Sequence, residues 1–362
     1  MEIEPLRLYV NEALRAPGMS HIPLLDLFWG LFAKEGMPHE TNALIKYGYD
    51  KRYYQLVQNP YEAEYVVVPH DYWRLKEKRP DLLLRIIEEA KQYQKPLLID
   101  ASGDKFGKVV VPNARVLRIN QYRFDLPVYE ITTPVICEDL LETYCDNVLT
   151  IRDKSSVSVV GFTGWASMPL TQRIRTVLKE LPVRFKALFV TQYIVYKKGV
   201  FWREKAIKIF KRSSDIKTNF IIRSSYSGHA ITLKGNRQKN RKEFVQNILE
   251  SDYTLIVKGD ANAATRFYET LSLGRIPVVI DTAMVFPLED RLIYKDFCVF
   301  IDYRDLKNAP RILADFHKAL SPEQFKKMQK HARDAFENYL RYDAFSRHLA
   351  GILKVYLQEK LR

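Results

Sequence analysis

The stretch from Ser251 to Asp281 constrains the fold of this chain more than any other part. It reads SDYTLIVKGDANAATRFYETLSLGRIPVVID. An apolar, β-branched run from Thr254 to Val257 ends in Lys258 and Gly259, a pattern typical of a buried strand that runs into a turn. The stretch therefore begins with a strand and a glycine loop.

A helix is expected to follow this loop. Asn262 is placed to cap it, residues 263–273 propagate it, and Gly274 occupies the position of a left-handed C-terminal cap. Ile276 to Ile280 is a second apolar run. The pattern predicts a strand, a loop, a helix and a parallel strand, which is the repeating unit of a doubly wound sheet.

The helix is expected to have one packing face and one chemical face. The packing side carries Ala264, Phe267, Tyr268 and Leu271, and the other side carries Asn262, Thr265, Arg266 and Glu269.

An anionic ligand would suit this arrangement, because amide groups after Gly259 and the positive end of the helix dipole point toward the space above the loop. Arg266 adds a cation, and Glu269, one turn further, can accept hydrogen bonds from a ribose diol. The alternative is a solvated Arg266–Glu269 pair of little energetic consequence. Spacing alone leaves both interpretations open.

The chain resembles a known family over about residues 241–300. The shared pattern consists of Tyr253, Lys258-Gly259-Asp260, Thr265-Arg266, Glu269 and Gly274-Arg275-Ile276-Pro277-Val278. It looks like the nucleotide-sugar half of exostosin-like glycosyltransferases, although Thr265 and Arg275 depart from the residues usual there.

The resemblance implies an α/β chain of GT-B architecture: two Rossmann-like doubly wound domains facing a cleft, with a C-terminal helix that crosses back to the first. We expect an acceptor-side domain over 1–150, a donor domain over 151–340 and the returning helix over 341–362. The family implies that Arg266 and Glu269 hold the diphosphate and ribose of a UDP-sugar. The expected donor site also includes Thr265, Gly259, Asp260, Asn262 and the loop glycine Gly164.

Composition agrees with a folded two-domain protein. The 362 residues are 47% hydrophobic, and the net charge of +14 requires that polyanions be considered as ligands. Three scattered cysteines exclude a disulfide framework. The sequence shows no signal peptide or membrane span, which favours a soluble cytoplasmic protein.

Strand and helix signals alternate through both halves. Strands are expected at 6–10, 65–68, 97–99, 109–111 and 116–119, then at 157–161, 186–190, 220–223, 254–257, 276–280 and 298–302. Helices are expected at 24–34, from Thr41, at 80–94, 170–181, 243–250 and 263–273, and over 322–361 with a bend near 342–346. Two basic clusters, 197–212 and 234–242, are interpreted as solvated faces or as an electrostatic rim for an anionic ligand.

The chemistry expected is metal-free, because neither an Asp-x-Asp triplet nor a ligand cluster of metal spacing is present. The family inverts the anomeric centre, which requires one general base for the acceptor hydroxyl. The candidates lie in the N-terminal half: Asp71 and His70 first, then His39-Glu40, then Asp100 and Asp104. Each of these residues could instead cap a helix or a turn. His229 is a further candidate near the donor sugar, with simple exposure as its alternative.

Three classes of function remain open from the sequence. The first is an inverting glycosyltransferase that moves a sugar, with xylose or galactose favoured, from a UDP-sugar to a glycan. The second is a basic nucleic-acid-binding protein, and the third is an inactive glycan-binding relative. No nucleic-acid motif supports the second class.

Overall fold

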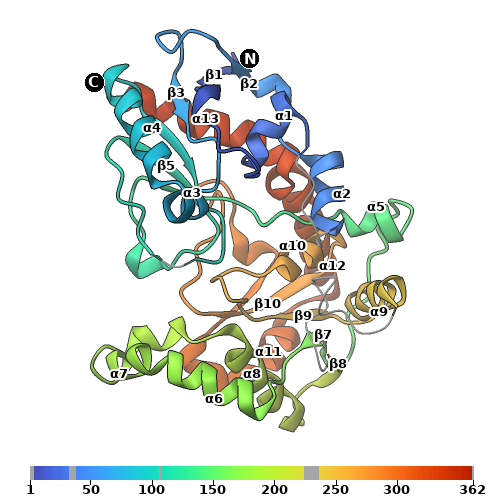
Figure 1. Ribbon diagram of the computed structural model, residues 1–362. Coiled ribbons are helices and arrows are strands. Elements are labelled where there is room, and N and C mark those ends of the chain that lie inside the picture. Colours follow the sequence, from blue (N-terminus) through green and yellow to red (C-terminus); the bar gives the residue numbers. More distant parts are fainter. Residues whose placement is uncertain (1–3, 32–37, 106, 224–235, 361–362) are drawn as a thin grey trace. The chain divides into compact units, whose positions relative to one another are not determined.

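The computed structural model describes residues 4–31, 38–105, 107–223 and 236–360 (Figure 1). The chain divides into two compact units. Unit 1 comprises Met1–Glu138, Val285–Leu288 and Glu337–Arg362, and unit 2 comprises Asp139–Met284 and Glu289–Phe336. Within the described part of the chain, no helix has the length and apolar character needed to cross a bilayer.

Unit 1 is built on a parallel sheet with the strand order β2-β1-β3-β4-β5-β6. Its strands are β1 Leu6–Tyr9, β2 Tyr54–Leu56, β3 Tyr65–Val67, β4 Leu97–Asp100, β5 Ala114–Arg118 and β6 Glu130–Thr132. Its helices are α1 Asp26–Trp29, α2 Pro38–Tyr47, α3 Tyr72–Lys78, α4 Pro80–Gln92 and α13 Tyr342–Lys360. Val66 and Ile99 of the sheet share a buried core with Leu75 of α3 and Ile86 of α4.

The last helix, α13, belongs to unit 1 although the whole of unit 2 precedes it in the chain. The Tyr54 hydroxyl donates to the Ser346 carbonyl at 2.8 Å, and the Tyr65 hydroxyl donates to the Leu353 carbonyl at 2.9 Å. A π-helical turn at Phe336–Leu340 separates α13 from the helix before it. The returning helix expected from the sequence is therefore confirmed.

Unit 2 is built on a second parallel sheet, with the order β11-β10-β9-β7-β8. Its strands are β7 Val159–Trp165, β8 Lys217–Arg223, β9 Tyr253–Ile256, β10 Ile276–Asp281 and β11 Val299–Asp302. Its helices are α5 Leu140–Tyr144, α6 Leu170–Lys179, α7 Leu181–Phe189, α8 Gly199–Arg212, α9 Arg237–Leu249, α10 Thr265–Ser272, α11 Ala309–Ala319 and α12 Pro322–Ala335.

The core of unit 2 lies between the sheet and the helices α8 and α11. Alternate residues of the strands, such as Leu255 and Val278, are fully buried there together with Phe210 of α8 and Leu313 of α11. Connections between parallel strands are right-handed, so α9 and α10, which lead the chain back across the sheet, cover the opposite face. The α/β class with two doubly wound parallel sheets, as expected for a GT-B chain, is confirmed.

Several expected elements are wrong. Residues 186–190 were expected to form a strand but lie largely in helix α7, because Leu181, Phe185 and Phe189 recur with a helical spacing. Residues 109–111 form no strand. The helix expected over 24–34 ends at Trp29, where Gly30 takes a φ of +79°.

Two further expectations fail at element ends. Helix α2 begins at Pro38, so Thr41 lies inside it and cannot cap it. Strand β7 continues through residues 162–165, which were expected to form a loop, because its pairing with β8 runs as far as Trp165.

Candidate active site

The loop between β9 and α10 is closed by its own backbone. The Gly259 N–H donates to the Ala263 carbonyl at 2.9 Å, so this amide is not one that points toward a ligand. Ala264, not Asn262, is the N-cap residue of α10, and no side chain caps it. The Asn262 amide instead bonds Thr282 twice, at 3.2 Å to its carbonyl and at 2.6 Å to its hydroxyl. The expected cap at Asn262 is therefore wrong.

The N-terminus of α8 packs tightly against this loop. A Cβ added to Gly199 would lie 2.2 Å from the carbonyl oxygens of both Lys258 and Gly259, so only glycine fits. Lys198 forms an exposed ion pair with Asp260 at 3.4 Å. The loop is thus fixed from one side by α8.

Lys258 is buried at the end of β9, with 1% of its surface exposed. Its ammonium donates to the Val195 carbonyl at 2.9 Å. Burial lowers the pKa of Lys258 to about 7, although the charges of Asp260 and Glu180 act in the opposite direction.

Arg266, in the first turn of α10, is held by strand β7. Its Nη2 donates to the Thr163 carbonyl at 2.5 Å, and its guanidinium lies over the Phe162 ring, 4.1 Å from the centroid. A Cβ added to Gly164 would lie 2.7 Å from the same Nη2. The guanidinium of Arg266 therefore lies so close to Gly164 that a side chain at this position would displace it.

This contact lies at the topological switch point of the unit 2 sheet. Strands β7 and β9 are neighbours, but the chain leaves β7 through α8 on one face and leaves β9 through α10 on the other. Open α/β sheets bind ligands in the crevice outside the carboxyl ends of such strands. Thr163 and Gly164 lie at the carboxyl end of β7, and Arg266 bonds the chain there.

Glu269 does not pair with Arg266. Its carboxylate forms an ion pair with Arg241 of α9 at 2.7 Å, and the side chains of both residues are nearly buried. The solvated Arg266–Glu269 pair is therefore not found, and the Glu269 side of α10 is not an open face. Thr265 is exposed at the start of the helix.

The C-terminal end of α10 follows the expected pattern. Gly274 takes a φ of +61°, the Gly274 N–H donates to the Leu271 carbonyl, and the Arg275 N–H donates to the Thr270 carbonyl. This left-handed cap returns the chain directly into β10.

In unit 1, His70 lies at the corresponding switch point, between the carboxyl ends of β1 and β3. Its Nε2 accepts from the Ala16 N–H and its Nδ1 donates to the Ser20 carbonyl, both at 2.9 Å. Burial lowers the pKa of His70, which favours the neutral ring that these two bonds require. Both ring nitrogens are therefore hydrogen-bonded to backbone groups. This arrangement fits a structural role better than proton transfer.

Asp71 is the N-cap of α3, where its Oδ1 accepts from the Arg74 N–H at 2.9 Å. Burial raises the pKa of Asp71, although this bond and the charges of Arg74 and Lys105 oppose the shift. Capping and a base function both remain compatible with this carboxylate.

The other base candidates are dispersed. Asp100 accepts from the Ser102 N–H at 2.8 Å, as a turn residue does, and the Asp104 carbonyl accepts from Asn120. Glu40 lies in α2 and is half-buried. The His39 side chain and all of His229 lie outside the described residues.

Sequence reasoning missed a histidine–carboxylate pair. His21 Nε2 lies 2.8 Å from Asp26 Oδ1, and His21 forms a β-bridge with His70 after strand β3. It also missed Arg241 and Gly199 as parts of the donor-side structure. Of these, only Arg241 had a sequence signal, as a member of the basic cluster 234–242.

In residues 4–31, 38–105, 107–223 and 236–360, no three His, Cys, Asp or Glu side chains come together in a way that could hold a metal ion.

Part of the chain is similar in sequence to known proteins. The family model of the Exostosin GT47 domain matches residues 202–316, from α8 to α11. The Exostosin-1 homolog of Caenorhabditis elegans is 25% identical over 129 residues, 35% of this chain and 33% of that protein. Exostosin-1 of Drosophila melanogaster is 26% identical over 104 residues, 29% of this chain and 13% of that protein. The chain thus spans a third or less of these relatives.

Solved structures resemble the chain at low similarity. A glycosyltransferase from Rickettsia africae ESF-5 has a TM-score of 0.37 and 11% identity, over 98% of this chain and 99% of its own. MnaA of S. aureus, solved with UDP, has a TM-score of 0.35 and 10% identity, over 98% of this chain and 96% of its own. The sequence and family comparisons confirm the resemblance to exostosin-like glycosyltransferases, which rests on the match of residues 202–316 to the Exostosin GT47 domain.

Proposed function

We propose that the chain is an inverting glycosyltransferase that moves a sugar from a UDP-sugar to a hydroxyl group of a glycan. The observation that carries this proposal is the position of Arg266. Its guanidinium is held against Thr163 at the switch point of unit 2, inside the segment that matches the Exostosin GT47 domain.

The diphosphate would bind at the carboxyl ends of β7 and β9. Arg266 is aligned by the Thr163 carbonyl and the Phe162 ring, so little of its rotamer freedom remains to be lost on binding. A fixed cation and the N-terminus of α10 would stabilise the charge that grows on the leaving diphosphate. Because of this electrostatic stabilisation, we propose that the reaction does not require a metal ion. We also propose that Thr265, Asp260 and Gly164 line the donor site.

On the acceptor side we propose Asp71 as the general base. Burial raises the pKa of its carboxyl group, which strengthens the carboxylate as a base. We propose xylose or galactose as the sugar.

Calorimetry with UDP tests the donor site directly. Arg266→Ala should lower UDP affinity at least tenfold, because a hydrogen bond to a charged group is worth about 1.5–3 kcal/mol. Arg304→Ala is the matched control, since Arg304 is an exposed arginine paired only locally with Asp302. UDP release measured over a panel of UDP-sugars then identifies the donor. Unchanged UDP affinity in Arg266→Ala would remove the basis of the proposal.

A further inference from the structure

Helices α6 and α7 expose an apolar stripe that the proposed reaction does not use. Its seven residues are each between 52% and 76% exposed. They are Leu170, Ile174, Leu178, Leu181, Phe185, Leu188 and Phe189. Soluble monomers rarely leave so many large apolar side chains exposed together, and such patches mark interaction surfaces.

Within each helix, the exposed apolar residues lie on one side. At 100° per residue, Leu170, Ile174 and Leu178 fall within 80° of one another on α6, and the apolar residues of α7 repeat the same spacing. The Phe185 and Phe189 rings pack edge to face, with centroids 5.3 Å apart. The sole fully buried residue of α6 is Thr176, on the opposite side, and α7 has none.

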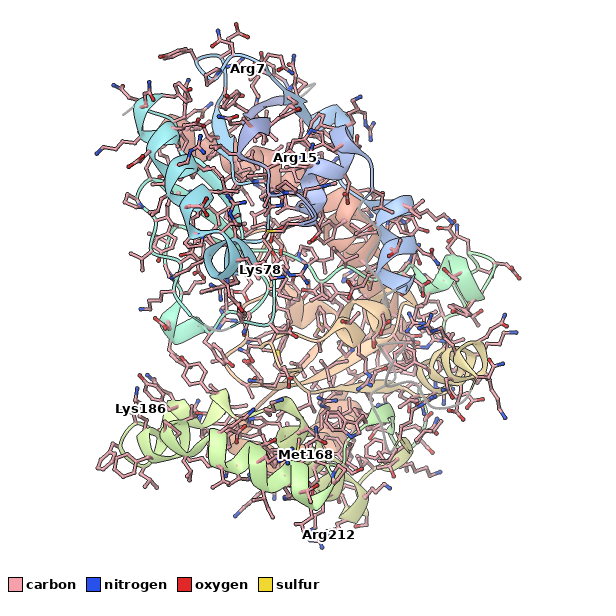
Figure 2. All side chains as sticks on the ribbon, in the orientation of Figure 1. Arg7, Arg15, Lys78, Met168, Lys186 and Arg212 are labelled. Atoms are coloured by element: carbon pink, nitrogen blue, oxygen red, sulfur yellow. The ribbon has the colours of Figure 1, made fainter. Side chains whose placement is uncertain are left out.

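Basic residues border this stripe on both sides. By the same helical geometry, Arg173 and Arg184 lie along one border, and Arg175 and Lys186 lie along the other. Figure 2 shows the side chains of both helices on the ribbon, with Lys186 labelled. Residues 168–198 contain seven Lys or Arg and a single acidic residue, Glu180, for a formal charge of +6.

One border of the stripe is paired with carboxylates. Glu180 is buried, and its carboxylate accepts from the Lys198 N–H at 2.7 Å and from Arg184 at 2.8 Å. Arg173 forms an ion pair with Glu204 of α8 at 3.0 Å. The exposed cations of the other border, Arg175 and Lys186, are therefore the ones that the stripe offers to an anionic partner.

We propose that α6 and α7 dock on the surface of an anionic lipid bilayer. A basic amphipathic helix with Leu and Phe on its apolar face lies in the bilayer interface, and anionic headgroups attract its Lys and Arg residues. The charge favours this occupant over a second copy of the chain, because two such surfaces face to face would bring the cations Arg175 and Lys186 of each copy against those of the other. The proposal is independent of the sugar-transfer reaction.

Vesicle flotation tests the apolar stripe. The 362-residue chain is mixed with phosphatidylcholine vesicles, or with vesicles containing 30% phosphatidylglycerol, at low and high salt. Binding to the anionic vesicles should be at least tenfold stronger and should fall as salt rises. The variant Leu188→Glu with Phe189→Glu should lose at least tenfold of that binding. The matched control, Leu84→Glu with Val128→Glu, changes two exposed apolar residues of unit 1 and should bind like the wild type.

A second pair of variants tests the basic border. Arg175→Gln with Lys186→Gln should weaken binding to the anionic vesicles about tenfold, since each cation contributes separately. Lys91→Gln with Lys211→Gln removes the same charge from exposed positions elsewhere and should have little effect. Near-ultraviolet circular dichroism verifies that every variant is folded.

Three results would overturn the proposal. One is wild-type binding that does not distinguish the two kinds of vesicle, and another is an equal loss in the test and control variants. The third is a dimer in light scattering that Leu188→Glu with Phe189→Glu dissociates while vesicle binding is absent, which would make the stripe a contact between copies.

Discussion

The Glu269 carboxylate lies 2.7 Å from the Arg241 guanidinium, so the carboxylate on the donor helix is aligned by a neighbouring helix. A ribose diol at this carboxylate would therefore meet an acceptor whose orientation is already fixed. Arg241 belongs to the basic cluster 234–242. This ion pair gives Arg241 a specific structural contact in addition to its contribution to the charge of the cluster.

Breaking this pair should destabilise unit 2. Glu269→Ala and Arg241→Ala should each cost on the order of 3 kcal/mol in the free energy of unfolding, because each leaves a nearly buried charge without its partner. The double variant should cost clearly less than the sum of the two. Urea denaturation of all four proteins measures this coupling. Additive losses would show that the pair contributes nothing.

The same carboxylate also bears on ligand binding. Glu269→Ala should lower UDP affinity at least tenfold if Glu269 holds the ribose. Arg241→Ala separates the two effects, since it removes the ion pair and keeps the carboxylate. Equal UDP affinity in both variants would assign Glu269 a structural role alone.

Gly164→Ala should lower UDP affinity about tenfold while the protein remains folded. The added Cβ would lie 2.7 Å from Nη2 of Arg266, at the far end of a flexible side chain that can move away. The guanidinium would then lose its alignment by the Thr163 carbonyl. Gly103→Ala is the matched control, since a Cβ there meets nothing within 4 Å. Calorimetry with UDP compares the two, and equal affinities would argue against Arg266 as the diphosphate ligand.

Asp71→Asn should lower the transfer rate about 10²–10⁴-fold with little change in UDP affinity, because it removes a general base. The amide oxygen can still accept from the Arg74 N–H, so α3 keeps its cap. Steady-state transfer rates measured beside UDP affinity decide the matter. Near-normal turnover would direct attention to the His21–Asp26 pair.

His70→Ala is the companion variant for Asp71→Asn. It should lower stability by about 1–3 kcal/mol for each backbone group left unpaired, at Ala16 and at Ser20. Thermal denaturation measures this loss, which a purely catalytic His70 would not produce.

Turnover is expected to survive removal of divalent ions. The cationic Arg266 and the N-terminus of α10 can stabilise the departing diphosphate by themselves. Transfer assays with and without EDTA test this expectation. Complete loss of turnover that manganese restores would contradict it.

Stability should rise with pH in the range set by Lys258. Burial lowers its pKa to about 7 in the folded protein, against an ordinary value of 10.5. Between these values the unfolded chain binds a proton that the folded chain does not, so the free energy of unfolding increases by at most about 1.4 kcal/mol per pH unit. Lys258→Met should remove this increase. Urea denaturation of both proteins at pH 7, 8 and 9 shows it, and parallel curves would contradict it.

Local pattern sufficed for the stretch that organises unit 2. The expected strand, helix and strand lie within two residues of β9, α10 and β10, because hydrophobic period and a glycine at Gly274 determine them locally. The prediction missed helix α7 because it rested on residues 186–190 alone. The helical spacing of apolar residues begins at Leu181.

Contacts distant in sequence could not be predicted in this way. Asn262 bonds Thr282, 20 residues later, so its capping propensity is overridden by a partner that no local pattern indicates. Glu269 likewise pairs with Arg241 of the preceding helix. The residues of the candidate site were thus identifiable by type, while their partners were not.

The returning helix α13 makes the order of folding differ from the order of synthesis. Tyr54 and Tyr65 of the first sheet bond residues 292 and 288 positions further along the chain. On the ribosome, the strands of the first unit emerge before those of the second but lack these partners until residues 346 and 353 have been translated. The strands of the second unit emerge as one consecutive series and can pair as they appear. The first unit therefore obtains its last helix only after every strand of the second unit has been made.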